Sequence, residues 1–128
     1  MIVSLDSNAY SDWRRSGLWS SVITFADRIF ISSVVLGELR FGFRAGRFEK
    51  ENERLLQEFL LSNVVEVASI GEEESPVYAL LKDHLRQNGS PIPTNDIWIA
   101  ASAITKGSSL LTRDKHFENL PQVRVRWP

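Results

Sequence analysis

The stretch that decides the fold stands at the start of the chain, where residues 2–8 read IVSLDSN. A short apolar run is followed at once by the carboxylate of Asp6 and by polar residues that can start a helix. Short apolar runs of this kind are typical of strands buried on both faces of a parallel sheet. Asp6 would then lie at the carboxyl end of a central strand, where open α/β sheets form their ligand crevices.

The composition is that of an ordinary globular chain, with 43% hydrophobic and 24% charged residues among 128. We expect a single domain over residues 1–128, with no disulfide or thiolate metal site because cysteine is absent. No signal peptide and no apolar run of about 18 residues is evident, which predicts a cytoplasmic protein with no membrane contact. The net charge of −1 does not exclude RNA, because acids gathered at one site would leave the remaining surface basic.

Strand-like apolar runs alternate with amphipathic helices along the rest of the chain. Further strands are predicted at 28–31, 64–68, 109–112 and 123–126, and helices at 18–27, 34–46, 49–62, 71–87 and 94–106. The first helix would be capped by Ser7 or Asn8 and stopped by Gly17, and Ser32 or Ser33 would cap the helix after the second strand. This alternation predicts βαβ units and an α/β fold with a mainly parallel sheet of four to five strands.

Four carboxylates fall where such a sheet would bring them to one edge. Asp6 ends the first strand, Glu38 lies one turn into the helix after the second, Asp96 opens the helix leading to the fourth, and Asp114 follows the fourth. Four carboxylates cannot share a small space without a cation, because like charges raise one another's pKa. Ligand sets made only of oxygen suit Mg²⁺ or Mn²⁺ rather than zinc, and such ions can activate water for phosphodiester hydrolysis.

Each acid also has an ordinary structural explanation. Asp6 could cap a helix, Asp96 is a common first-turn acid, Asp114 could cap a turn, and Glu38 could pair with a nearby arginine on the surface. Taken together, the four explanations are less satisfactory, because surface acids have no reason to favour one edge of the sheet.

Four segments in the same order resemble the PIN-domain ribonucleases, and most closely the VapC-type toxins of bacterial toxin–antitoxin pairs. They are DSN at 6–8, SVVLGEL at 33–39, TNDIWIAA at 94–101 and LTRDKHF at 111–117, and together they span nearly the whole chain. The resemblance implies a three-layer α/β/α sandwich and an endoribonuclease that depends on Mg²⁺ or Mn²⁺ and hydrolyses RNA with metal-activated water. It also implies inhibition by a cognate antitoxin protein, and a homodimer.

The resemblance assigns residues to the site by position. Asp6, Glu38, Asp96 and Asp114 would be the catalytic, metal-binding acids. Polar side chains beside them would orient these carboxylates, namely Ser7, Asn8, Asn95 and Thr112. Basic residues expected near the same rim are candidates for RNA contact, namely Arg113, Lys115, Arg14, Arg40 and Arg44.

Several alternatives stay open at this stage. His116 is either a general base or, as the stronger interpretation, a polar residue of the loop after the fourth strand. Phe41, Phe43 and Phe48 could form a surface for an antitoxin or for self-association, or could be core. The chain could be a non-catalytic PIN-fold module that binds RNA or protein. A phosphatase of the haloacid-dehalogenase kind is disfavoured, because it needs a second aspartate where Asn8 stands.

Overall fold

The computed structural model describes residues 1–128, which form a five-stranded sheet between two layers of helices. All neighbouring strands are parallel, which confirms the predicted sheet, and their order is β3-β2-β1-β4-β5. The strands are β1 (Ile2–Leu5), β2 (Arg28–Ser32), β3 (Val65–Ala68), β4 (Ser109–Leu111) and β5 (Val125–Arg126). The first strand of the chain is therefore the central strand of the sheet.

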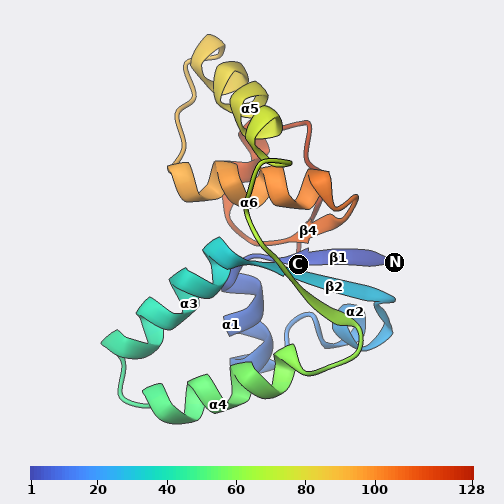
Figure 1. Cartoon of the computed structure of the whole chain (residues 1–128), viewed down its shortest axis with the longest axis vertical. Helices are drawn as coiled ribbons and strands as arrows, with labels where there is room; N and C mark the ends of the chain where they lie inside the picture. The colour runs from blue at the N-terminus through green and yellow to red at the C-terminus, as the bar shows by residue number, and fades with distance from the viewer.

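The helices cover both faces of this sheet, as predicted for a three-layer α/β/α sandwich. Figure 1 shows α1, α3 and α4 on one face and α5 and α6 on the other. The helices are α1 (Ser7–Ser16), α2 (Ser20–Phe25), α3 (Ser33–Ala45), α4 (Glu49–Leu60), α5 (Ser75–Gln87) and α6 (Thr94–Thr105), with a 3₁₀ helix, η1, at Lys115–Asn119. None of these helices combines the length and the apolar character that a membrane span would need.

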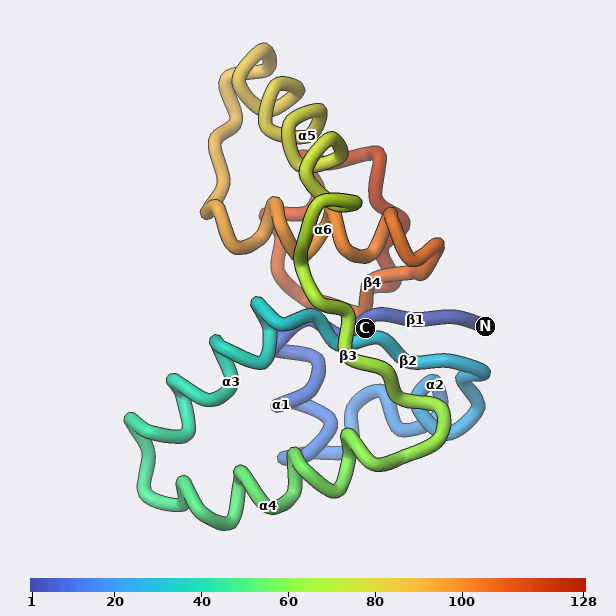
Figure 2. Tube along the Cα trace, viewed as in Figure 1, coloured from blue at the N-terminus to red at the C-terminus, as the bar shows by residue number.

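Burial explains why β1 organises the fold. Val3 and Leu5 of β1 are almost completely buried, as are Ile31 of β2 and Leu110 and Leu111 of β4. The Cα trace in Figure 2 shows β3 leaving the layer of α4 and leading across the sheet edge to α5 in the other layer. Because both helix layers pack on the central strands, the carboxyl ends of these strands are held in one place.

The helix starts differ from the prediction in two details. Asp6 itself caps α1, since its Oδ1 accepts a hydrogen bond from the Ser7 backbone N–H at 2.8 Å; a cap at Ser7 or Asn8 was wrong. The extended backbone of Asp6 allows its side chain to fold back over the new helix. Helix α5 begins at Ser75 rather than near Gly71, because residues 72–74 form a turn before the proline at its start.

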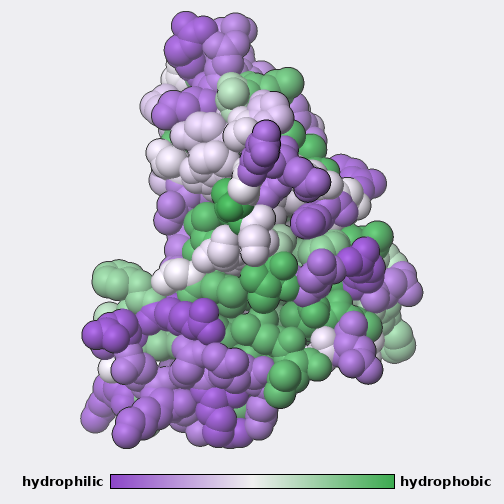
Figure 3. Space-filling view, viewed as in Figure 1, coloured by the Kyte–Doolittle hydropathy of each residue, from purple (hydrophilic) through white to green (hydrophobic).

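Two of the three phenylalanines near the junction of α3 and α4 lie outside the core. Phe41 and Phe48 are 75% and 68% exposed, whereas Phe43 packs partly against the core. The last turns of α3 extend away from the sheet toward the start of α4 (Figure 2). A second apolar surface covers the edge strand β3 and the segment before it, where Leu61 and Val67 are exposed (Figure 3).

Candidate metal centre

Asp6 is a buried carboxylate at the carboxyl end of β1. Its Oδ2 accepts hydrogen bonds from Thr112 Oγ1 at 2.7 Å and from Asn8 Nδ2 at 3.0 Å. Burial, the largest cause, and the charges of Asp96 and Glu38 together raise the pKa of Asp6 to about 6, against the lowering effect of its hydrogen bonds. Keeping Asp6 ionised therefore costs the folded protein free energy.

Asp96 and Asp114 reach the same site from the other side of the sheet's edge. Asp96 is buried in the first turn of α6, and burial, followed by the charges of Asp114 and Glu38, raises its pKa. Asp114 caps η1, where its Oδ1 accepts the His116 backbone N–H at 2.9 Å. The two carboxylates thus flank the turn that carries His116.

His116 points into this acidic site instead of into the solvent alone. Its Nδ1 lies 2.8 Å from Asp96 Oδ2 and 3.2 Å from Asp114 Oδ1. The hydrogen bond with Asp96 is the main cause that raises the pKa of His116. The interpretation of His116 as merely a polar loop residue was wrong, because η1 turns its ring back toward α6.

Glu38 contributes an oxygen that has no partner. Its Oε2 accepts a hydrogen bond from Asn95 Nδ2 at 3.4 Å, while its Oε1 is buried and has no hydrogen-bond donor. A buried, unpaired carboxylate oxygen is costly unless a donor or a cation contacts it. A donor set of four carboxylates, one of which has an unpaired buried oxygen, fits a hard divalent cation.

Uncharged side chains fix the geometry of these acids. Thr112 Oγ1 donates to Asp6 and accepts from the Asp114 backbone N–H at 3.0 Å. Asn8 bridges the ends of β1 and β4, because its Oδ1 accepts from the Arg113 backbone N–H at 3.1 Å. Ser7 takes part through its backbone N–H. The residues predicted to orient the acids thus lie beside them.

A cleft of about 770 Å³ opens next to the acids, between α1, α3 and α4. Ser7, Asn8 and Glu38 line it at one end, and Arg14 and Arg113 add positive charge. Arg14 lies over the ring of Trp13, 4.2 Å from the ring centroid, and donates to the Leu55 carbonyl at 3.1 Å. Its guanidinium is thus held at the cleft by stacking and by a hydrogen bond.

The predicted location of Arg40 and Arg44 at the same rim was wrong. Arg40 pairs with Glu53 of α4 at 3.0 Å and lines a separate hollow together with Arg44. Arg40 follows Glu38 by two residues, which turns its side chain roughly 200° around the helix axis. Lys115 is exposed on η1.

Asp12 is a further buried carboxylate, which was not predicted from the sequence. Asp12 accepts hydrogen bonds from Arg113 Nε at 2.6 Å and from Arg15 Nη2 at 2.8 Å. The bond from Arg113 is the first cause that lowers the pKa of Asp12. The pairing of Asp12 with Arg15 could have been predicted from their spacing of three residues on one helix. Nothing in the local sequence indicated the pairing with the distant Arg113.

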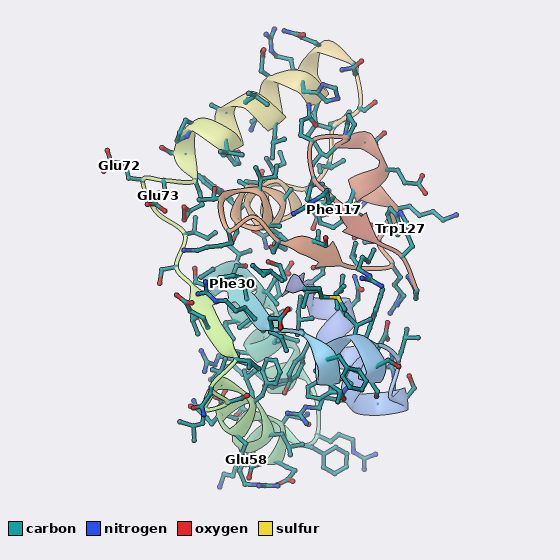
Figure 4. All side chains as sticks on the ribbon, turned by 90° about the vertical axis from the view of Figure 1, so that its right-hand side faces the viewer. Phe30, Glu58, Glu72, Glu73, Phe117 and Trp127 are labelled. Carbon is teal, nitrogen blue, oxygen red and sulfur yellow. The ribbon has the colours of Figure 1, made fainter.

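Two acids that follow β3 lie away from the site. Glu72 and Glu73 are exposed and project outward from the connection between β3 and α5 (Figure 4). In contrast, Phe117 of η1 is 1% exposed and lies in the interior beside α6 (Figure 4). Its burial holds η1, and with it Asp114 and His116, against the first turns of α6.

The fold and the acids at the sheet's edge are those of a PIN-domain protein. The PIN domain family matches residues 5–123, so the chain belongs to that family. Within it, the chain is 37% identical over 95 residues to Ribonuclease VapC4 of Mycobacterium tuberculosis, covering 74% of this chain and 73% of the relative. It is 32% identical over 96 residues to Ribonuclease VapC2 of Rickettsia felis, covering 74% and 70%. The chain is thus of the VapC type.

Solved structures agree with this assignment. The chain superposes with a TM-score of 0.84 and 26% identity on a chain of VapBC2 from Rickettsia felis bound to a DNA fragment from its promoter, covering 99% of this chain and 98% of the other. It superposes with a TM-score of 0.85 and 23% identity on a chain of VapBC-1 from nontypeable Haemophilus influenzae, covering 98% and 97%. The second likeness bears on the fold alone.

Proposed function

We propose that this protein is a metal-dependent endoribonuclease and the toxin component of a toxin–antitoxin pair, acting in the cytoplasm as a single domain over residues 1–128. The observation that carries the proposal is the gathering of Asp6, Glu38, Asp96 and Asp114, from four separate segments, closely enough for their charges to act on one another, with one buried oxygen of Glu38 left without a partner. Its similarity to proteins named Ribonuclease VapC supports an activity on RNA.

The four acids would hold Mg²⁺ or Mn²⁺, which suit carboxylate ligands. When bound, such an ion lowers the pKa of water and stabilises charge on phosphodiester oxygens. Thr112 and Asn8 hold the Asp6 carboxylate in one orientation, and Asn95 does the same for Glu38. These uncharged contacts would preorganise the site before the RNA arrives.

The cleft beside the acids is the proposed path of the RNA strand. Arg14 and Arg113 line it and would contact phosphate oxygens, which fix the register of a strand without reading its sequence. Arg113 is itself held by Asp12, so its charge is presented at a fixed point next to Asp114. The RNA would thus enter along α1 and meet the acids at the end of β1.

A cognate antitoxin is the proposed protein partner, and a homodimer the proposed assembly. The VapBC2 structure to which this chain is similar supports the first of these. An arginine of the antitoxin entering the acidic pocket would neutralise it without chemistry, and exposed Phe41 and Phe48 offer apolar surface for the same partner. A complex in which the pocket stays open would refute insertion of an arginine.

A non-catalytic module that binds RNA or protein is the rival function. Such a module has no need for four acids whose gathering raises the pKa of Asp6 and Asp96. The experiment that separates the two follows cleavage of a labelled single-stranded RNA with Mg²⁺, with Mn²⁺ and with a chelator. Cleavage should require the ion and should be lost in Asp6→Asn and in Asp96→Asn.

The matched control is Asp83→Asn, which removes the same charge from an exposed position on α5. This variant should cleave as the unchanged protein does. Cleavage that survives both site substitutions would refute the proposal, and RNA binding without cleavage under any ion would support the module. Expression in a bacterial host should slow growth for the unchanged protein and for Asp83→Asn but not for Asp6→Asn.

A further inference from the structure

The acidic site contains one nitrogen donor, the imidazole of His116, which the oxygen-only ligand set leaves out. Nδ1 of this ring faces two carboxylate oxygens at once, Asp96 Oδ2 at 2.8 Å and Asp114 Oδ1 at 3.2 Å. Neighbouring ligands of an octahedral ion with bonds near 2.1 Å lie about 3.0 Å apart. Nδ1 is therefore spaced from each of the two oxygens as an adjacent ligand of one ion would be, and one ligand atom from each of the three residues lies within 4.8 Å of the other two.

Holding Asp114 in place does not require the ring. The backbone N–H of His116 already donates to Asp114 Oδ1 at 2.9 Å, and Asp114 caps η1 through this bond. A single N–H on Nδ1 could donate well to only one of the two oxygens that it faces. An ion shared by all three atoms makes use of both contacts.

The position of the ring is set by the fold rather than by a freely moving side chain. His116 precedes Phe117, which is 1% exposed and anchors η1 in the core. Asp96 is fixed in the first turn of α6, which packs against η1. The imidazole and the two carboxylates therefore come together on two elements that hold each other in place.

We propose that His116 is a direct ligand of the bound ion, together with Asp96 and Asp114, and that it makes the site select Mn²⁺ over Mg²⁺. Carboxylates bind both ions, whereas imidazole nitrogen favours transition-metal ions over Mg²⁺, which prefers oxygen. The inference rests on the proposed function, because it concerns the ion of the same site. It adds a ligand and an order of preference that the four acids alone do not provide.

The chain offers a matched control, because it has two histidines. His84 lies half-buried on α5, outside the acidic site, and its ring is within hydrogen-bond distance of Asn88. His116→Asn keeps a side-chain amide that can donate to Asp96, yet it removes the imidazole nitrogen. His84→Asn removes the same group from a position outside the site. Circular dichroism should show both variants folded.

The direct readout is the electron spin-echo modulation of Mn²⁺ bound to the full-length protein. The unchanged protein and His84→Asn should show coupling to a coordinated imidazole nitrogen, and His116→Asn should not. In calorimetric titrations, His116→Asn should lower Mn²⁺ affinity by at least about tenfold, while Mg²⁺ affinity changes less than about threefold.

Two results would overturn this inference while leaving the proposed function intact. One is Mn²⁺ bound to the unchanged protein, with RNA cleavage, but without nitrogen coupling. The other is an equal loss of Mn²⁺ and Mg²⁺ affinity in His116→Asn, which would make the ring an orienting partner of Asp96. Failure of the unchanged protein to bind either ion and to cleave RNA would instead overturn both proposals.

Discussion

Replacing Asp6 by asparagine should change how the stability of the cation-free protein depends on pH. The pKa of Asp6 is about 6 in the folded protein, against 3.8 for the ordinary group. Because the folded state binds this proton more tightly, the free energy of unfolding falls as pH rises from about 4 through about 6. At about 1.4 kcal/mol per pKa unit, the loss approaches about 3 kcal/mol at neutral pH.

Asparagine does not ionise, so Asp6→Asn should lack this loss. The amide nitrogen of the new asparagine would replace one of the two Asp6 oxygens, and both oxygens accept hydrogen bonds. It would therefore face either the donors of Thr112 and Asn8 or the N–H of Ser7, and this mismatch costs about 1–2 kcal/mol at every pH. We therefore expect the variant to be less stable than the unchanged protein by about 1–2 kcal/mol near pH 4, where Asp6 is protonated in the folded state. Near neutral pH the order should reverse, with the variant more stable by about 1–2 kcal/mol, because the unchanged protein has lost about 3 kcal/mol.

The assay is urea unfolding with a chelator present, at steps of pH between about 4 and 7. Asp83→Asn serves as the control, because Asp83 is exposed on α5 and its substitution should give a curve parallel to that of the unchanged protein. Parallel curves for Asp6→Asn as well would show that the folded state does not penalise the Asp6 charge. If the prediction holds, addition of a divalent cation should raise the stability of the unchanged protein far more than that of Asp6→Asn.

Three further outcomes are expected. Arg14→Ala should weaken RNA binding and lower the salt slope of log affinity by about 0.7, as for one lost phosphate contact, whereas Arg44→Ala outside the cleft should change neither in filter binding. Asp12→Asn should cost about 1–2 kcal/mol in urea unfolding at neutral pH and less as pH falls toward 3, because Arg113 lowers the pKa of Asp12. Gly17→Ala should cost about 1 kcal/mol in thermal unfolding, since Gly17 ends α1 at a φ of +76°.

The parallel sheet and the meeting of the acids could be predicted because both follow from chain order. Each inner strand is recognisable as an apolar run. Asp6 and Asp114 follow strand ends, Asp96 lies in a first helical turn, and Glu38 lies one turn into its helix. In the structure β1 and β4 are neighbours, with Leu5 opposite Leu111, so the residues that follow them are brought together. The order of the strands alone therefore brings Asp6 and Asp114 to the same edge of the sheet, about one side-chain length apart.

The pairings that depend on side-chain direction could not be predicted in the same way. Asp12 and Arg113 are 101 residues apart, and nothing in either local sequence marks the other as its partner. The direction of His116 depends on a 3₁₀ turn whose orientation is set by the burial of Phe117. The position of Arg40 away from the acids, in contrast, could have been predicted, because its spacing of two residues from Glu38 puts the two side chains on different sides of the helix.

Burial of the acids links the stability of the fold to what binds the site. Desolvation is the first cause that raises the pKa of Asp6 and of Asp96, so the charged form of each carboxylate costs the folded protein free energy. A divalent ion would offset that cost, and so would the guanidinium of a partner protein inserted between the same oxygens. Both would neutralise the same carboxylates and contact the same unpaired Glu38 oxygen. We therefore expect the ion and an inserted arginine to compete, so that raising Mn²⁺ weakens binding of such a partner to the unchanged protein.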